Sequence, residues 1–170
     1  MRVFVTGTGR CGTTTFAKAC SHITNYTSGH ETHWRPSFDN SKVREYADGH
    51  IESDPHLVWH IGVLANRYPD AWWVHLVRER ESCVRSLAKT MGVRDWARLA
   101  YVGQNDVQAA ASDFYDFVNQ TVPLALAEMQ CITMHLERLK EEWYLFWNLI
   151  GAEGDYEASV RELGVRHNAR

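Results

Sequence analysis

Short apolar runs alternate along this chain with longer segments in which apolar residues recur every three or four positions. The runs predict strands over residues 2–6, 71–77 and 131–134, with a further short strand over 23–28. Residues 71–77 are apolar almost throughout, which is typical of a strand buried on both faces of a parallel sheet. The apolar runs therefore indicate a sheet with a buried centre.

Helical spacing predicts helices over 13–20, 55–68, 79–90 and 137–150, and over most of 94–128 with an interruption near Gly103 and a kink at Pro123. Residues 30–54 lack a period and predict a functional loop with one helical turn at most. Strands that alternate with helices predict an α/β fold of three layers around a central parallel sheet. Because no repeat or linker breaks the pattern, residues 1–170 predict a single domain.

The composition narrows the class of protein. Of 170 residues, 45% are hydrophobic and 23% charged, which is globular rather than disordered. The net charge of −3 argues against a nucleic-acid partner, so any anion site must come from local geometry. No apolar run approaches the ~18 residues of a membrane helix, and the N-terminus does not resemble a signal peptide. The four cysteines form no CxxC pair, and we expect reduced thiols in a cytoplasmic protein.

The segment from Gly7 to Thr14 lies between the first predicted strand and the first predicted helix, where a phosphate loop belongs. Its glycines let backbone N–H groups converge, and the helix start adds its positive dipole end. The spacing matches GxxxxG, but Thr13 stands where a Walker A loop has Lys, and the cation is Arg10 instead. Hydroxyl donors follow at Thr13, Thr14 and Thr15. The alternative is a glycine turn that binds nothing.

Arg78 and Ser86 form a second candidate anion site. Arg78 follows the apolar strand at 71–77, and the carboxyl ends of such strands bind ligands in open α/β sheets. Ser86 comes eight residues later, about two turns into the next predicted helix. An arginine fork and a hydroxyl so placed can share one phosphate. The other charged residues of this helix, Glu79, Arg80, Glu81 and Arg85, are expected to form an ordinary mixed-charge surface.

Both sites resemble those of sulfotransferases. Arg10-Cys11-Gly12-Thr13-Thr14 is similar to the family's 5′-phosphosulfate loop, and Arg78 with Ser86 is similar to its 3′-phosphate motif. The lead-in Tyr68-Pro69-Asp70-Ala71 and the segment 131–151 also resemble the family. The resemblance implies a P-loop-like topology and a sulfuryl transfer from 3′-phosphoadenosine-5′-phosphosulfate (PAPS) to a small-molecule or glycan acceptor, with no metal required. It assigns PAPS and its product, adenosine 3′,5′-bisphosphate (PAP), to Arg10, Cys11, Gly12, Thr13, Thr14, Thr15, Arg78 and Ser86.

The chain also departs from that family. The usual Arg-Asp-Pro is Arg78-Glu79-Arg80, and the Arg-Lys-Gly element near the C-terminus is absent, with Arg161, Arg166 or Arg170 as its only candidate substitutes. Many members are longer, so the acceptor-binding elements are either short or completed by a second subunit of a homodimer. A P-loop nucleotide or small-molecule kinase and a non-catalytic nucleotide-binding module remain alternatives, although the missing Walker lysine counts against the kinase.

Sulfuryl transfer needs a base, and the resemblance directs attention to Gly29-His30-Glu31-Thr32-His33 after the second predicted strand. Glu31 is the first candidate and His33 the second, while Arg10 would stabilise the leaving group. Alternatively, Glu31 pairs with Arg35 and does no chemistry. Trp34 either covers the adenine or acceptor or caps the core. A zinc site from His30, His33, His56 and His60 is disfavoured because no Asp, Glu or Cys completes a recognisable ligand set.

Overall fold

The computed structural model describes residues 1–33, 45–90, 106–165 and 167. Its centre is a sheet of five strands in the order β2-β3-β1-β4-β5, and every pairing in it is parallel. The strands are β1 (Val3–Thr6), β2 (Thr27–His30), β3 (His50–Ser53), β4 (Trp72–Val77) and β5 (Cys131–His135). The predicted parallel sheet is therefore confirmed.

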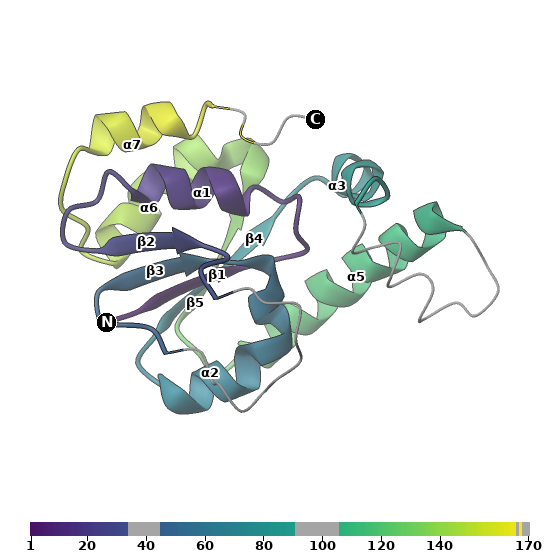
Figure 1. Cartoon of the computed structure of the whole chain (residues 1–170), viewed down its shortest axis with the longest axis horizontal. Helices are drawn as coiled ribbons and strands as arrows, with labels where there is room; N and C mark the ends of the chain where they lie inside the picture. Colours follow the sequence, from purple (N-terminus) through teal and green to yellow (C-terminus); the bar gives the residue numbers. More distant parts are fainter. Residues whose placement is uncertain (34–44, 91–105, 166, 168–170) are drawn as a thin grey trace.

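Helices cover both faces of this sheet (Figure 1). One face carries α1 (Thr13–Cys20), α6 (Leu139–Leu149) and α7 (Tyr156–Glu162), and the other carries α2 (Ile61–Arg67) and α5 (Val107–Ala125). The remaining elements are α3 (Arg80–Leu87), which packs on α5, and the 3₁₀ helices η1 (Pro55–His60) and η2 (Leu136–Arg138). This arrangement confirms the predicted three-layer α/β/α fold. None of the described helices is both long and apolar enough to cross a membrane.

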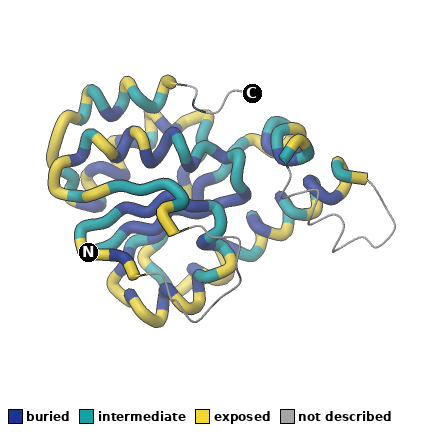
Figure 2. The backbone as a smooth tube through the Cα atoms, viewed as in Figure 1, coloured by how far each residue is buried: buried dark blue, intermediate teal, exposed yellow. Residues whose placement is uncertain are grey.

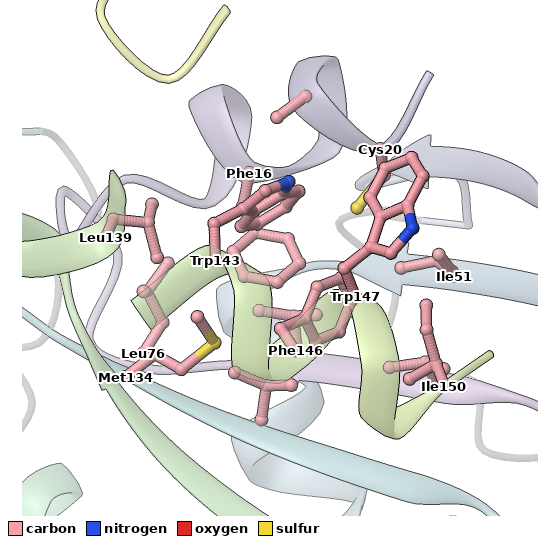
Figure 3. Close-up of a cluster of buried hydrophobic side chains, with 14 of the residues drawn as sticks. Phe16, Cys20, Ile51, Leu76, Met134, Leu139, Trp143, Phe146, Trp147 and Ile150 are labelled. Atoms are coloured by element: carbon pink, nitrogen blue, oxygen red, sulfur yellow. The ribbon is translucent and has the colours of Figure 1, made fainter. Parts of the chain in front are cut away.

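Successive residues of β1 supply the two cores between the layers. Val3 and Val5 face the core under α1 and α6, whereas Phe4 faces the core under α2 and α5. In the first core the ring of Phe16 lies 4.9 Å from Trp143 and 4.9 Å from Phe146, both centroid to centroid (Figure 3). The buried sheet is visible as the dark centre of Figure 2. Burial on both faces explains why β1 is apolar at successive positions.

The segment 30–54, predicted to be a loop, contains strand β3. Its four residues include one aliphatic side chain, Ile51, and the fully buried Glu52, so the sequence lacks the apolar run of a central strand. The strand predicted over 23–28 is shifted and begins at Thr27. Helix α7 follows Gly154 and was not predicted.

The helix predicted over 55–68 divides in two, because η1 precedes α2. Asp54 caps η1 by accepting a hydrogen bond from the backbone N–H of His56, and Pro55 occupies its first turn. Helix α5 contains Pro123, as predicted, whereas the interruption expected near Gly103 lies outside the described residues. The segment thus begins at Pro55 as predicted, but its first six residues form a 3₁₀ helix in place of an α-helix.

Candidate functional site

The loop between β1 and α1 turns sharply because three of its residues have left-handed backbones. The φ angles are 73° at Gly9, 55° at Arg10 and 104° at Gly12. Gly7 is needed for a different reason, since a Cβ there would lie 2.3 Å from the carbonyl oxygen of Leu76 on β4. The loop therefore passes close against β4 and then turns into the start of α1, where backbone N–H groups are free of helical partners.

Arg10 connects the loop with the second candidate anion site. Its Nε donates to Ser86 Oγ at 3.0 Å, and its carbonyl oxygen accepts a hydrogen bond from Arg78 Nη1 at 3.0 Å. The carbonyl oxygen of Arg78 in turn accepts from the hydroxyl of Tyr115 on α5 at 2.7 Å. The structure thus brings Arg10, Arg78 and Ser86 together, although 68 residues separate the two arginines.

These residues open onto a pocket of about 470 Å³. Among the described residues, its lining holds four cations, three hydroxyl groups and no carboxylate: Arg10, Arg78, Ser82, Arg85, Ser86, Lys89 and Thr90. Ser82, Arg85, Ser86 and Lys89 recur at intervals of three, one and three residues, which is one face of α3 and the turn after it. The lining is therefore cationic and rich in hydroxyl donors, a composition that suits an anion.

The structure corrects one expectation for the charged residues of α3. Arg85, expected on an ordinary surface, lines the pocket and donates to Ser82 Oγ at 3.2 Å. Glu79 caps the helix by accepting from two backbone N–H groups, and Arg80 pairs with Asp116 at 2.6 Å. The signal that identifies Arg85 is its helical spacing from Ser82, three residues before it, and Lys89, four residues after it.

The first turn of α1 meets the end of β2. Thr13 Oγ1 lies 3.2 Å and Thr14 Oγ1 3.1 Å from Nε2 of His30. The backbone oxygen of Thr13 accepts from Ser53 Oγ at 2.9 Å, and Thr15 is 9% exposed. His30 was considered only as a zinc ligand in the sequence analysis, so its contact with the loop threonines was missed.

Cys11 is fully buried, and burial, with the nearby Cys83, raises the pKa of its thiol to about 12. The side chain thus stays a neutral thiol at any physiological pH. It packs under the loop, where a Cβ at Gly7 would lie 2.8 Å from its sulfur. Only the backbone of Cys11 can face a ligand of the loop.

Glu31, the first candidate for the base, lies beside two residues that the sequence analysis did not connect with it. Glu31 has φ of 53°, and its carboxylate, that of Asp54 and a ring nitrogen of His56 lie within 4.8 Å of one another. Asp54 is fully buried, and its Oδ1 lies 2.8 Å from His56 Nδ1. With Nδ1–H donated to the carboxylate, Nε2 is the basic nitrogen of His56.

His33, the second candidate, lies elsewhere. Its ring packs edge-on against Tyr46, with the ring centroids 5.0 Å apart. Arg35, the suggested partner of Glu31, and Trp34 lie outside the described residues. The structure therefore places His56 next to Glu31. No sequence pattern indicates this neighbour, because the segment 30–54 lacks the apolar run of a strand.

The zinc site of four histidines is not formed within the described residues. The group of metal-ligand type found there is Glu31, Asp54 and His56. Of the four histidines, His56 has two carboxylates close to it, those of Asp54 and Glu31, which the sequence pattern did not bring together with it. Both atoms of the Asp54–His56 contact are already engaged with each other.

No family model and no curated protein sequence matches the chain. Among solved structures, it is similar to the sulfotransferase domain from the curacin biosynthetic pathway. The TM-score is 0.70, the match covers 92% of this chain and 75% of that one, and the sequences are 12% identical. The chain has a sulfotransferase fold. At this identity the likeness shows the fold alone, and the chemistry must be argued from the site.

Within this sulfotransferase fold, the loop after β1 and Arg78 after β4 lie at the carboxyl ends of two adjacent parallel strands. Ligands of open α/β sheets bind at that edge. Arg161, a candidate substitute for the missing C-terminal cation, lies on α7 and is not among the pocket residues. Arg166 and Arg170 lie outside the described residues.

Proposed function

We propose that this protein transfers a sulfuryl group from PAPS to a hydroxyl or amine of an acceptor. The observation that carries the proposal is the convergence of Arg10, Arg78 and Ser86 on one cationic pocket beside the loop at the start of α1. A 3′-phosphate and a 5′-phosphosulfate on one nucleoside need two adjacent anion sites, and the loop and the pocket supply two.

In this assignment the 3′-phosphate occupies the pocket. A phosphate monoester carries a charge of about −1.5 to −2 at neutral pH, and it suits a lining of Arg78, Arg85 and Lys89 with hydroxyl donors. The 5′-phosphosulfate lies on the loop, against the backbone N–H groups of Cys11 and Gly12 and the first turn of α1. The side chains there are Thr13, Thr14 and the largely buried Thr15.

Arg10 serves both ends of the donor. During transfer the acceptor oxygen or nitrogen bonds to sulfur while the bond from sulfur to the bridging oxygen breaks, and PAP leaves with the bonding pair. Negative charge grows on that bridging oxygen, where a guanidinium and convergent N–H groups stabilise it most. The proposal requires no metal, because these groups already oppose the developing charge.

The acceptor's proton goes to a base beside the loop. Glu31 is the first candidate, since its carboxylate is held near the His30 contact with Thr13 and Thr14. The Asp54–His56 pair favours a second candidate, because Asp54 orients the ring with Nε2 as the basic nitrogen. The acceptor, whether small molecule or glycan, and any second subunit remain expectations from the sequence.

Thermal unfolding with nucleotides tests the donor class. A ligand that binds only the folded state stabilises it by mass action, so PAP without magnesium should raise the melting temperature. At a PAP concentration one hundred times its dissociation constant, the free energy of unfolding should rise by about 2.7 kcal/mol. ATP with magnesium should stabilise much less. Strong stabilisation by ATP–magnesium with no effect of PAP would replace the proposal by the kinase alternative.

Turnover separates the enzyme from a module that only binds nucleotide. PAPS should be converted to PAP in the presence of one member of a panel of hydroxyl and amine acceptors, and the sulfated product should be found by mass. Binding of PAP with no turnover on any acceptor would favour the non-catalytic alternative.

A further inference from the structure

His30 stands out among the residues that the proposed mechanism does not use. It ends β2, and one atom of its ring, Nε2, lies within hydrogen-bonding distance of two hydroxyl oxygens, Thr13 Oγ1 at 3.2 Å and Thr14 Oγ1 at 3.1 Å. Both threonines belong to the first turn of α1, where the proposed function places the 5′-phosphosulfate. The question is what a single nitrogen does between two hydroxyls.

The geometry favours a hydrogen on that nitrogen. A bare Nε2 has one lone pair and accepts one good hydrogen bond, whereas an N–H can be shared between two oxygens. Glu31 Oε1 lies 3.9 Å from the same Nε2, and a carboxylate repels a lone pair and attracts an N–H. This arrangement favours His30 as the donor and the two threonine oxygens as acceptors.

This direction decides what the threonines offer a ligand. A hydroxyl has one hydrogen, so an oxygen that accepts from His30 keeps its own hydrogen for another acceptor. The first turn of a helix presents N–H donors, and an anion bound there is the acceptor that suits these hydrogens. If His30 instead accepted from a threonine, that threonine would turn its lone pairs toward the anion.

The surroundings fix His30 in this position. Its Cα partner in the sheet is Ser53, whose Oγ donates to the backbone oxygen of Thr13 at 2.9 Å. The turn after His30 is held by the fully buried Glu52, whose Oε1 accepts from Thr32 N–H at 2.8 Å and whose Oε2 lies 3.0 Å from His50 Nε2. Strand β3 therefore sets both partners of the contact.

We infer that His30 is a positioning residue for the 5′ end of the donor: its Nε2–H turns the hydroxyl hydrogens of Thr13 and Thr14 toward the bound phosphosulfate. The inference rests on the proposed function for the identity of the ligand. It assigns His30 no contact with the sulfuryl group and no proton transfer.

Binding of three nucleotides tests it without an acceptor. By calorimetry, His30→Leu should lower the affinity for adenosine 3′,5′-bisphosphate and for adenosine 5′-monophosphate by about ten-fold each. Its affinity for adenosine 3′-monophosphate should be unchanged. His30→Gln should retain most of the affinity, because its amide N–H₂ can donate to the same hydroxyls. His22→Leu is the matched control, since His22 is similarly exposed and pairs with Glu162 far from the loop. Equal losses for all three nucleotides would overturn the inference.

A double substitution separates positioning from general support of the fold. In a Thr13→Val/Thr14→Val background, His30→Leu should cost less than about two-fold further affinity, because the hydroxyls it orients are gone. A further ten-fold loss there would show that His30 acts by another route. The nitrogen-15 chemical shifts of the His30 ring supply a measurement that needs no variant. They should show hydrogen on Nε2 in the free protein, and a bare Nε2 would refute the inference.

The two hypotheses fail differently. If wild-type protein binds none of the three nucleotides, the proposed function fails, while the ring shifts still report the tautomer. If wild-type protein and the His30 variants bind the bisphosphate with the same affinity, the proposed function stands and the positioning role of His30 is refuted.

Discussion

At the scale of single residues, Arg10 and Arg78 depend on each other. Arg10 gives its carbonyl oxygen to Arg78 and its Nε to Ser86, so one residue holds the loop against both halves of the second site. An arginine has five N–H donors in a planar fork, a geometry that suits a phosphate as well as contacts of this kind. The pocket can therefore be ordered before any ligand arrives.

Arg78→Ala should weaken the binding of PAP by about 1.5–3 kcal/mol, the range for a hydrogen bond to a charged group. The reason is that the 3′-phosphate loses a hydrogen-bond donor. The affinity for adenosine 5′-monophosphate, which lacks that phosphate, should hardly change. Calorimetric titration of both nucleotides measures the difference. An equal loss for both would place Arg78 in the support of the loop through Arg10 and outside the phosphate site.

Glu31→Gln should leave PAP affinity nearly intact and reduce turnover by roughly 10²-fold, because the amide keeps the shape and cannot accept the acceptor's proton. His33→Ala should turn over normally, since His33 packs on Tyr46. His56→Ala is the informative comparison. Normal turnover of Glu31→Gln with loss in His56→Ala would transfer the role of base to the Asp54–His56 pair. Normal turnover of all three would place the base outside this group.

Spacing in the sequence was enough to predict contacts between residues that belong to one motif. Arg78 and Ser86 follow each other through one strand and one helix, and the loop motif supplies Arg10. Two contacts were missed, that of His30 with the threonines of α1 and the approach of His56 to Glu31, because each joins elements that are separate in the sequence. The register of β2 on β3 sets His30 opposite Ser53, which contacts Thr13, and that register is not readable from local periodicity.

At the scale of elements, β3 shows where sequence patterns fail. Its residues His50, Ile51, Glu52 and Ser53 are mostly polar, yet the last three are buried, because Glu52 and Ser53 hold the loops on either side. Apolar runs predict β1 and β4 correctly because both of their faces meet a core. A strand such as β3, whose buried residues are mostly polar and hydrogen-bonded, therefore has an amino-acid sequence that resembles that of a loop.

The glycines of the loop and of α2 give a paired test of this close packing. Gly7→Ala should destabilise the protein by about 1–3 kcal/mol, because its Cβ would lie 2.3 Å from a backbone oxygen of β4 that cannot move freely. Gly62→Ala, in helix α2 with nothing within 4 Å of its Cβ, should instead stabilise by about 0.5–1 kcal/mol. Urea unfolding measures both. Similar values for the two variants would contradict the packing of the loop against β4.

At the scale of the whole molecule, the parallel sheet places the site and the two cores stabilise it. Alternation of strands and helices predicted the three layers, and the layers put the loop after β1 beside the end of β4. The meeting of Arg10, Arg78 and Ser86 was therefore predictable from the sequence, and their role in binding PAPS stays a prediction. The residues that bind the acceptor were not predictable, because Trp34 lies in the segment 30–54, which has no period that fixes its place.

The sheet also contains a group that couples stability to pH. His75 lies on β4 with 2% of its surface exposed, and burial lowers the pKa of its imidazole from 6.5 to about 4. Between these values the unfolded chain binds a proton that the folded protein does not, so stability falls as pH falls from 6.5 to about 4. Above pH 6.5 this contribution is constant. The loss over the window is of the order of 3 kcal/mol, since each pKa unit corresponds to about 1.4 kcal/mol.

His75→Val should remove much of this pH dependence of stability. The difference in unfolding free energy between about pH 7.5 and pH 5 should shrink, whatever the substitution costs at neutral pH. Comparing differences cancels the packing term, and His22→Val, on the surface, should retain the wild-type difference. An unchanged difference in His75→Val would mean that other groups carry the acid sensitivity of the fold.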